Sequence, residues 1–134
     1  MDKKIEIFKA LSDEIRVRIL NLFIKNDREI CVCELIDALK LPQYTISKAL
    51  NILKSAGLFT TEKKGLWVYY QLNIDDSVNK SLFDFLKDFL NAEILFEDEA
   101  RLRNRLLLRK NDKCVVGTIP EEDLLRMIKE KIKV

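Results

Sequence analysis

Three cysteines, Cys31, Cys33 and Cys114, carry the most distinctive chemistry of the 134-residue sequence. A thiolate binds soft ions and is open to oxidation, but a cysteine also packs as a small apolar side chain. The sequence contains no histidine, which is the commonest general base near neutral pH and the commonest ligand of zinc, nickel and copper. A nucleophilic thiol would lack its activating base, and a histidine-built zinc, cobalt or nickel site is excluded. We therefore expect no enzyme.

The spacing of Cys31 and Cys33 limits what the pair can bind. We expect a helix from about Cys31 to Lys40, which places both thiols in its first turn. Side chains two residues apart on a helix point about 200° away from each other. Both sulfurs would reach one ion only if that turn were distorted, and the strain would act on the segment before the next helix. The helix N-terminus would also favour the thiolate form.

The segment after this pair has the pattern of a helix-turn-helix. Leu41-Pro42 ends the first helix, because a residue before proline disfavours the helical conformation. A second helix runs from Pro42 to Ala56, and Gly57 supplies the left-handed conformation at its end. Two helices joined by so short a turn are typical of this motif. Two earlier helices are expected, one over Ile5–Leu11 and one from an N-cap at Ser12 to about Lys25.

After Gly57 the apolar pattern changes from helical to alternating. Phe59–Glu62 and Leu66–Leu72 are predicted strands, and Lys63-Lys64-Gly65 lies between them as the basic tip of a β-hairpin. A helix-turn-helix followed at once by such a hairpin is the winged-helix order. We therefore predict a mostly α fold with a β-hairpin wing.

The helix before the hairpin has an apolar side and a polar side. Ile46, Leu50 and Leu53 recur at helical spacing and are expected to face the core. The polar side suits base edges and phosphates, and the N-terminal part of such a helix enters the DNA major groove. A merely solvated face is the alternative, but the lysines directly downstream favour DNA. The predicted DNA-binding residues are Gln43, Tyr44, Thr45, Ser47, Lys48, Asn51, Lys63 and Lys64.

The region after the hairpin is expected to be helical. Large apolar residues between Leu82 and Phe96 are too many for one side of a lone helix, so we expect burial against the domain and against a partner subunit. We predict a winged-helix DNA-binding and dimerisation domain over residues 1–96. A C-terminal helical extension over residues 97–134 would carry Cys114.

The expected extension has three features. A basic stripe continues the helix, Asn111-Asp112 breaks it, and Thr118 and Glu121 form a capping box that opens a last amphipathic helix. The arginines of the stripe are Arg101, Arg103, Arg105 and Arg109.

Composition indicates a small cytoplasmic protein. Apolar residues make up 48% and charged residues 34%, which is ordinary for a globular chain. No secretory signal follows Met1, and no apolar run approaches the roughly 20 residues that span a bilayer. Three cysteines without such a signal favour a reducing compartment. We expect no membrane partner and no required cofactor.

Four segments together resemble the ArsR-type repressors, the arsenical-resistance and metal-sensing family of winged-helix regulators. They are FKALSDEIRVRILNLF, EICVCELIDAL, LPQYTISKALNILKSAGL and KKGLWVYYQL, in the family's order and spacing. The resemblance implies a homodimer held by the first helix and the helix after the wing. It also implies an apo form bound to double-stranded operator DNA and released by an inducer. Ala49 departs from the family, because many relatives have histidine after the pair that is Ser47-Lys48 here.

The resemblance extends to the cysteines through the family's Cys-Val-Cys pattern. Arsenite-sensing members usually carry a third cysteine shortly after the pair, where this sequence has Ile36. We therefore predict a three-thiolate site of Cys31, Cys33 and Cys114, the last from the same or the neighbouring protomer. Trivalent arsenic, As(III), suits three sulfurs in a pyramid, and so does Sb(III). Alternatively, the pair binds the metalloid with a solvent oxygen and Cys114 is structural; lead and cadmium also stay open as inducers.

Two other functions fit the same residues. A thiol-redox or persulfide-sensing repressor would bridge Cys31 or Cys33 to Cys114, since a disulfide within the pair would be strained. The second alternative function is that of a winged helix that binds a protein instead of DNA. Steep salt dependence of binding would indicate DNA phosphates instead.

Overall fold

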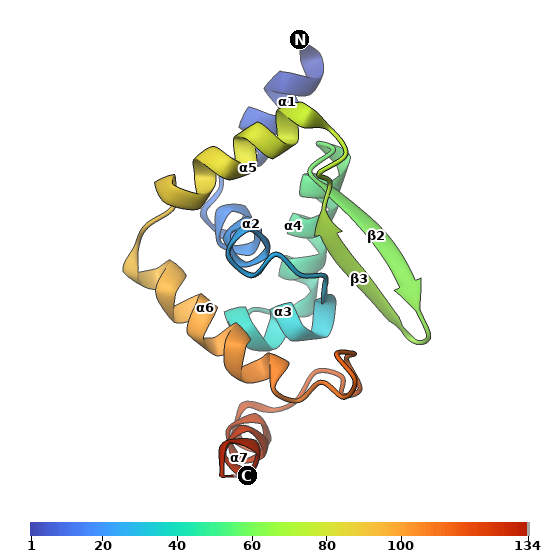
Figure 1. Cartoon of the computed structure of the whole chain (residues 1–134), viewed down its shortest axis with the longest axis vertical. Coiled ribbons are helices and arrows are strands. Elements are labelled where there is room, and N and C mark those ends of the chain that lie inside the picture. Colours follow the sequence, from blue (N-terminus) through green and yellow to red (C-terminus); the bar gives the residue numbers. More distant parts are fainter. Residues whose placement is uncertain (134) are drawn as a thin grey trace.

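The computed structural model describes residues 1–133, and these residues form seven helices and a three-stranded antiparallel sheet. Figure 1 shows a β-hairpin projecting from the group of helices. The helices are α1 (Asp2–Ala10), α2 (Glu14–Asn26), α3 (Val32–Leu39), α4 (Gln43–Ser55), α5 (Ser77–Phe89), α6 (Glu93–Leu106) and α7 (Glu121–Ile132). The strands are β1 (Ile30–Cys31), β2 (Phe59–Lys64) and β3 (Trp67–Leu72). The predicted mostly helical fold with a hairpin wing is therefore confirmed.

The helix-turn-helix consists of α3 and α4. Lys40 ends α3 in the left-handed conformation, with φ 57°, and Pro42 is the N-cap of α4. Ile46, Leu50 and Leu53 are fully buried, as predicted, and belong to the main hydrophobic core. Their burial fixes which side of α4 remains exposed.

The second helix starts one residue later than expected. Asp13, not Ser12, is the N-cap of α2, and its carboxylate accepts a hydrogen bond from the backbone of Arg16 at 3.1 Å. The Ser12 hydroxyl instead donates to the Lys9 carbonyl at 2.7 Å, at the end of α1. Ser12 therefore closes the preceding helix rather than opening the next.

The sheet differs from the expected hairpin in two ways. β2 extends through Lys63 and Lys64, so the turn is Gly65-Leu66, where Gly65 has φ 61°. In addition, β1 pairs antiparallel with β3 and gives the strand order β1-β3-β2. The apolar dipeptide of β1 satisfies its backbone in this ladder, and α3 therefore begins at Val32 rather than Cys31.

Two helices, not one, follow the wing. The chain breaks between α5 and α6, where Leu90 has ψ 101° and Ala92 is fully extended. Lys25 donates to the Leu90 carbonyl at 2.8 Å, which satisfies a group that the helix end leaves free. The break lets α5 pack on α2 while α6 packs on α2 and α3 (Figure 1). The expected domain boundary after residue 96 falls inside α6.

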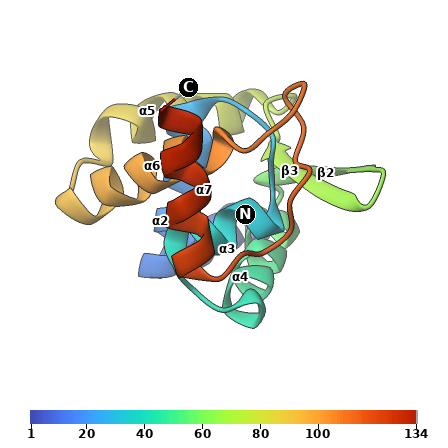
Figure 2. The same cartoon turned by 90° about the horizontal axis from the view of Figure 1, so that it is seen from below.

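The last helix does not begin with the expected capping box. Pro120, not Thr118, is the N-cap of α7, and Glu121 pairs with Lys40 at 2.7 Å. Figure 2 shows the segment between α6 and α7 running past the base of the wing and beside α3 to reach the α3–α4 turn. Among the described residues, the helices are too short or too polar to cross a membrane.

Candidate functional site

The three cysteines meet in one buried cluster, all within a single chain. Their Sγ atoms lie within 4.8 Å of one another. The Sγ atoms of Cys31 and Cys33 are 3.0 Å apart, and those of Cys33 and Cys114 are 3.3 Å apart. The three residues are 1%, 7% and 3% exposed, and all are free thiols. The structure thus brings together, from one protomer, the three cysteines that the sequence analysis singled out.

The expected conflict between Cys31 and Cys33 does not arise. Cys31 ends β1 and is the N-cap of α3 with extended dihedrals, φ −92° and ψ 162°, so the helical angle between the two side chains does not apply. Its backbone N–H donates to Glu34 Oε1 at 3.2 Å. The expectation that one ion could be shared only by distorting the helix is therefore wrong, because one thiol lies before the helix.

Cys114 reaches the pair through a tight turn after α6. Asn111 and Asp112 both have positive φ, 53° and 59°, and Lys110 and Lys113 exchange two backbone hydrogen bonds of 3.0 Å across them. Two successive left-handed residues are typical of a type I′ turn, which asparagine and aspartate tolerate. The predicted break at Asn111-Asp112 is thus a chain reversal that returns Cys114 to the base of the wing.

Tyr69 of β3 connects two of the cysteines to the wing. Its hydroxyl accepts a hydrogen bond from the backbone N–H of Cys114 at 2.9 Å, and its backbone lies opposite Cys31 in the sheet. Tyr69 is 2% exposed, and Trp67 packs against the same cluster. The sulfur cluster is therefore part of the base of the wing as well as of α3.

Two buried ion pairs beside the cluster join α3 to Arg105 of α6 and to Arg109 in the segment after it. Arg105 Nε donates to Asp37 Oδ2 at 2.6 Å. Arg109 donates from Nε and Nη2 to the two carboxylate oxygens of Glu34, each at 2.7 Å. These arginines belong to the expected basic stripe, but they are not on a solvated face: their side chains are 1% and 3% exposed.

Sequence reasoning missed these pairs, although a signal was present. The arginines stand four residues apart and the carboxylates three apart, a spacing that predicts one side of a helix for each set. In the structure α6 ends at Leu106, and Arg109 lies in the segment after it. Two helices with such complementary sides can pair face to face. Nothing in the sequence alone shows that α3 and α6 are neighbours.

Hydrogen bonding among the three sulfurs gives the cysteine thiols different pKa values. The Cys31 thiol, and then the Cys33 thiol, lower the pKa of Cys114, and Arg105 acts in the same direction. Hydrogen bonding to Cys114 is the largest cause that raises the pKa of Cys31 and of Cys33. These hydrogen bonds, with Arg105 nearby, favour the thiolate form of Cys114, and a thiolate is the form that binds soft ions.

The predicted DNA-binding residues lie apart from the sulfurs, on α4 and the wing. We call the polar residues of α4 the polar α4 face. Tyr44 is 75% exposed, and Lys48 and Asn51 are exposed, whereas Ala49 is buried. Within residues 1–133 the side chains of this face make no hydrogen bond to protein groups. The polar α4 face consists of Gln43, Tyr44, Thr45, Ser47, Lys48 and Asn51.

The two wing lysines differ in their surroundings. Lys64 donates to Glu29 Oε1 at 2.6 Å, and the hydrogen bond to Glu29 raises the pKa of Lys64. Lys63 is exposed and forms no ion pair within the described residues. Lys63 is therefore the freer of the two for a phosphate.

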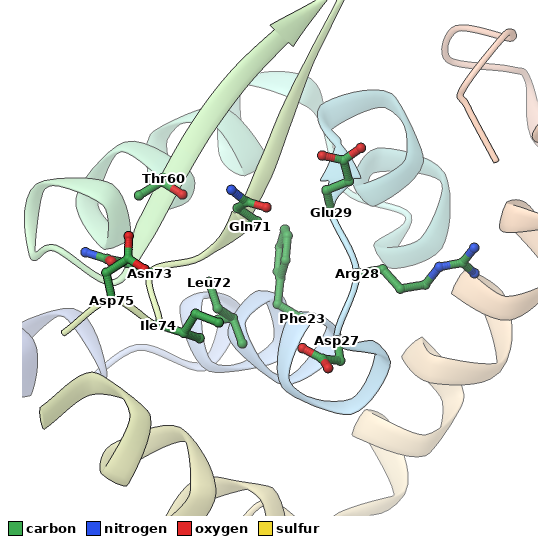
Figure 3. A pocket seen from close by; sticks show the side chains of 10 residues that line it. All are labelled: Phe23, Asp27, Arg28, Glu29, Thr60, Gln71, Leu72, Asn73, Ile74 and Asp75. Atoms are coloured by element: carbon green, nitrogen blue, oxygen red, sulfur yellow. The ribbon is translucent and has the colours of Figure 1, made fainter. Parts of the chain in front are cut away.

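A polar pocket lies between α2, the segment before β1 and the sheet (Figure 3). None of the predicted site residues lines it. Figure 3 shows Arg28 pointing away from the pocket, and its guanidinium pairs with Asp112. The pocket is lined by Phe23, Asp27, Arg28, Glu29, Thr60, Gln71, Leu72, Asn73, Ile74 and Asp75.

Comparisons with known proteins agree with this geometry. An uncharacterized HTH-type transcriptional regulator of Methanocaldococcus jannaschii is 48% identical over 79 residues, which cover 59% of this chain and 86% of that protein. The arsenic resistance transcriptional regulator ArsR2 of Pseudomonas putida is 40% identical over 101 residues, 74% of this chain and 85% of the relative. The solved structure of reduced HlyU from Vibrio cholerae superposes with a TM-score of 0.59 at 30% identity, over 68% of this chain and 92% of that one.

Residues 13–61 match the family described as "Bacterial regulatory protein, arsR family". This match spans α2 to β2 and so includes the whole helix-turn-helix. The chain therefore belongs to the arsR family and is a winged-helix, DNA-binding transcriptional repressor rather than an enzyme.

Proposed function

We propose that this repressor binds operator DNA as a homodimer and releases it when trivalent arsenic, or antimony, is bound by Cys31, Cys33 and Cys114. The observation that carries the proposal is the convergence of three buried sulfurs within 4.8 Å. The name of one relative adds support, the arsenic resistance transcriptional regulator ArsR2 of Pseudomonas putida.

Three sulfurs match the chemistry of arsenite in water. Arsenous acid, As(OH)₃, exchanges three As–O bonds for three As–S bonds, and each thiol proton leaves with a hydroxide as water. No atom changes its oxidation state.

The polar α4 face and the wing supply the DNA contacts in this proposal. The N-terminal half of α4 enters the major groove, where Gln43 suits adenine and Lys48 suits guanine or phosphate. Lys63 and Lys64 contact the backbone, so affinity falls steeply with salt.

A second copy of the chain covers exposed apolar side chains of α1 and α5. Phe8 is 71% exposed, Phe85 60% and Phe89 65%, and the rings of the last two stack at 5.0 Å. Monomeric proteins rarely leave such neighbouring aromatic residues in water. These two helices are also those that the family resemblance implies for the dimer.

The sulfur cluster acts on DNA binding through the base of the wing. Drawing three sulfurs onto one atom moves the Cys114 segment and the first turn of α3 relative to each other. The Tyr69 hydroxyl accepts a hydrogen bond from Cys114, and the Tyr69 backbone pairs with Cys31, directly before α3. The wing and α3 then shift relative to α4. The wing lysines and the polar α4 face can then no longer contact the same operator at once.

Serine variants test the site. Cys31→Ser and Cys33→Ser should keep operator affinity, because both lie away from the polar α4 face, but should abolish release by arsenite in a DNA-shift assay. Cys114→Ser decides between three and two sulfurs, and X-ray absorption of the arsenite-loaded protein counts the sulfurs directly. Release of operator DNA by arsenite in either Cys31→Ser or Cys33→Ser would contradict the proposal.

A thiol-redox or persulfide sensor is the second candidate, favoured by the 3.3 Å between Cys33 and Cys114. A disulfide here requires an oxidant: with hydrogen peroxide, two thiols give one S–S bond and two waters. The structural neighbour named reduced HlyU has the same fold. Titration with arsenite, peroxide and tetrasulfide, each read as operator release, separates the two candidates.

A further inference from the structure

The sulfur cluster lies against four buried charged groups that cancel one another. Arg105 pairs with Asp37, and Arg109 pairs with Glu34. All four side chains are at most 3% exposed. The surroundings of the sulfurs thus contain two positive and two negative charges, and their net charge is zero.

Arg105 is the cation that ties the cluster together. Its Nη2 donates to the carbonyl of Val116 at 2.7 Å and to that of Gly117 at 3.3 Å, which holds the segment that follows Cys114. Its Nη1 is buried without a hydrogen-bond partner in the described part of the chain. Cys33 and Cys114 lie near this guanidinium, and within the described residues Asp37 is the only carboxylate that pairs with it.

We infer that the Arg105–Asp37 pair is a specificity determinant, which selects trivalent metalloids over divalent soft ions by keeping the surroundings of the sulfurs neutral. The inference rests on the proposed function and explains which ions the sulfur cluster prefers to bind. Three thiolates with As(III) or Sb(III) make a neutral complex. Three thiolates with Cd²⁺, whose binding displaces three thiol protons into solvent, make a complex of charge minus one.

A buried charge without a partner is strongly disfavoured. Both ions start from the same empty site, so the ratio of their affinities depends on the loaded sites only. A neutral environment therefore favours the metalloid, and one extra positive charge beside the sulfurs would favour Cd²⁺. Residues that do not touch the ion set this preference, as outer groups do in other metal sites.

Opposite single substitutions test the inference. Arsenite and Cd²⁺ dissociation constants are measured by calorimetry on the full chain, together with the ratio of the Cd²⁺ value to the arsenite value. Asp37→Asn leaves Arg105 unbalanced and should lower this ratio by about tenfold or more, the scale on which a neighbouring charge acts. Arg105→Gln leaves Asp37 unbalanced and should raise it. The double variant should return near the wild-type ratio.

The sign reversal separates charge from damage to the fold. A disturbed site would weaken both ions in both single variants and would not be repaired in the double variant. Arg103→Gln is the matched control, since Arg103 is exposed on the same helix and should leave the ratio unchanged. Glu34→Gln repeats the test on the second pair should Asp37→Asn not fold, and it too should lower the ratio.

Two results would overturn the inference. One is a shift of the ratio in the same direction in both single variants, and the other is no shift at all. A Cd²⁺ affinity that collapses in Asp37→Asn alone would show that the carboxylate binds the ion directly. Failure of the proposed function itself would give a different result: X-ray absorption would count fewer than three sulfurs around arsenic in the wild-type protein.

Discussion

The polar α4 face and the sulfur cluster both depend on the α3–α4 unit, but the two regions are built in opposite ways. The side chains of the polar α4 face make no hydrogen bond within the described chain, whereas each cysteine contacts another sulfur and a hydrogen-bonded support. A surface without internal partners keeps its donors and acceptors for a ligand. A buried cluster must instead be complete before its ligand arrives.

This difference predicts how each region tolerates change. Substitutions on the polar α4 face should alter DNA binding and leave stability nearly untouched. Substitutions around the sulfurs should affect the fold first, because their supports also join α6, α3 and β3. Three measurements test this contrast, in order of decreasing expected effect.

Arg109→Met should be the most disruptive substitution. It leaves the Glu34 carboxylate buried without its bidentate partner, which costs about 3–5 kcal/mol of unfolding free energy. Urea unfolding followed by circular dichroism measures the loss. Arg28→Met is the control, because Arg28 and Asp112 form an exposed pair, 42% and 71% exposed, worth about 0–1 kcal/mol. Equal losses in the two variants would contradict the contrast.

Tyr69→Phe should have an intermediate effect. It removes only the hydroxyl that accepts from the Cys114 backbone, and an orphaned buried N–H costs about 1–3 kcal/mol. Operator affinity without inducer should be retained, while arsenite should release DNA less completely because the wing loses its bond to the Cys114 segment. Thermal unfolding and a DNA-shift titration measure both quantities, and full release in Tyr69→Phe would exclude this route.

Lys63→Ala should lower DNA affinity and leave stability unchanged. Loss of one phosphate contact lowers the slope of log affinity against log salt by about 1 per contact, with little effect on sequence preference. Lys64→Ala should give a smaller change, because Lys64 must leave Glu29, 2.6 Å away, to reach a phosphate. Fluorescence anisotropy at several salt concentrations gives both slopes. A larger change in Lys64→Ala would place the main contact on the paired lysine.

Much of the fold was predictable because its signals are local. The spacing of Ile46, Leu50 and Leu53 set the buried side of α4, and Gly57 marked its end. Alternation after Gly57 predicted the wing. The break between α5 and α6 was missed, since Leu90-Asn91-Ala92 contains neither glycine nor proline and the apolar pattern continues across it.

The winged helix-turn-helix, the exposed polar side of α4 and the cysteine pair can all be predicted from sequence, because periodicity and residue type act over a few neighbouring positions. Long-range packing is needed to place Cys31 in a strand, to return Cys114 to the pair through the turn at Asn111-Asp112, and to bury Arg105 and Arg109 against α3. The contacts of Cys114, Arg105 and Arg109 join residues 68 to 81 positions apart. Their formation depends on how the helices pack, which no local pattern encodes.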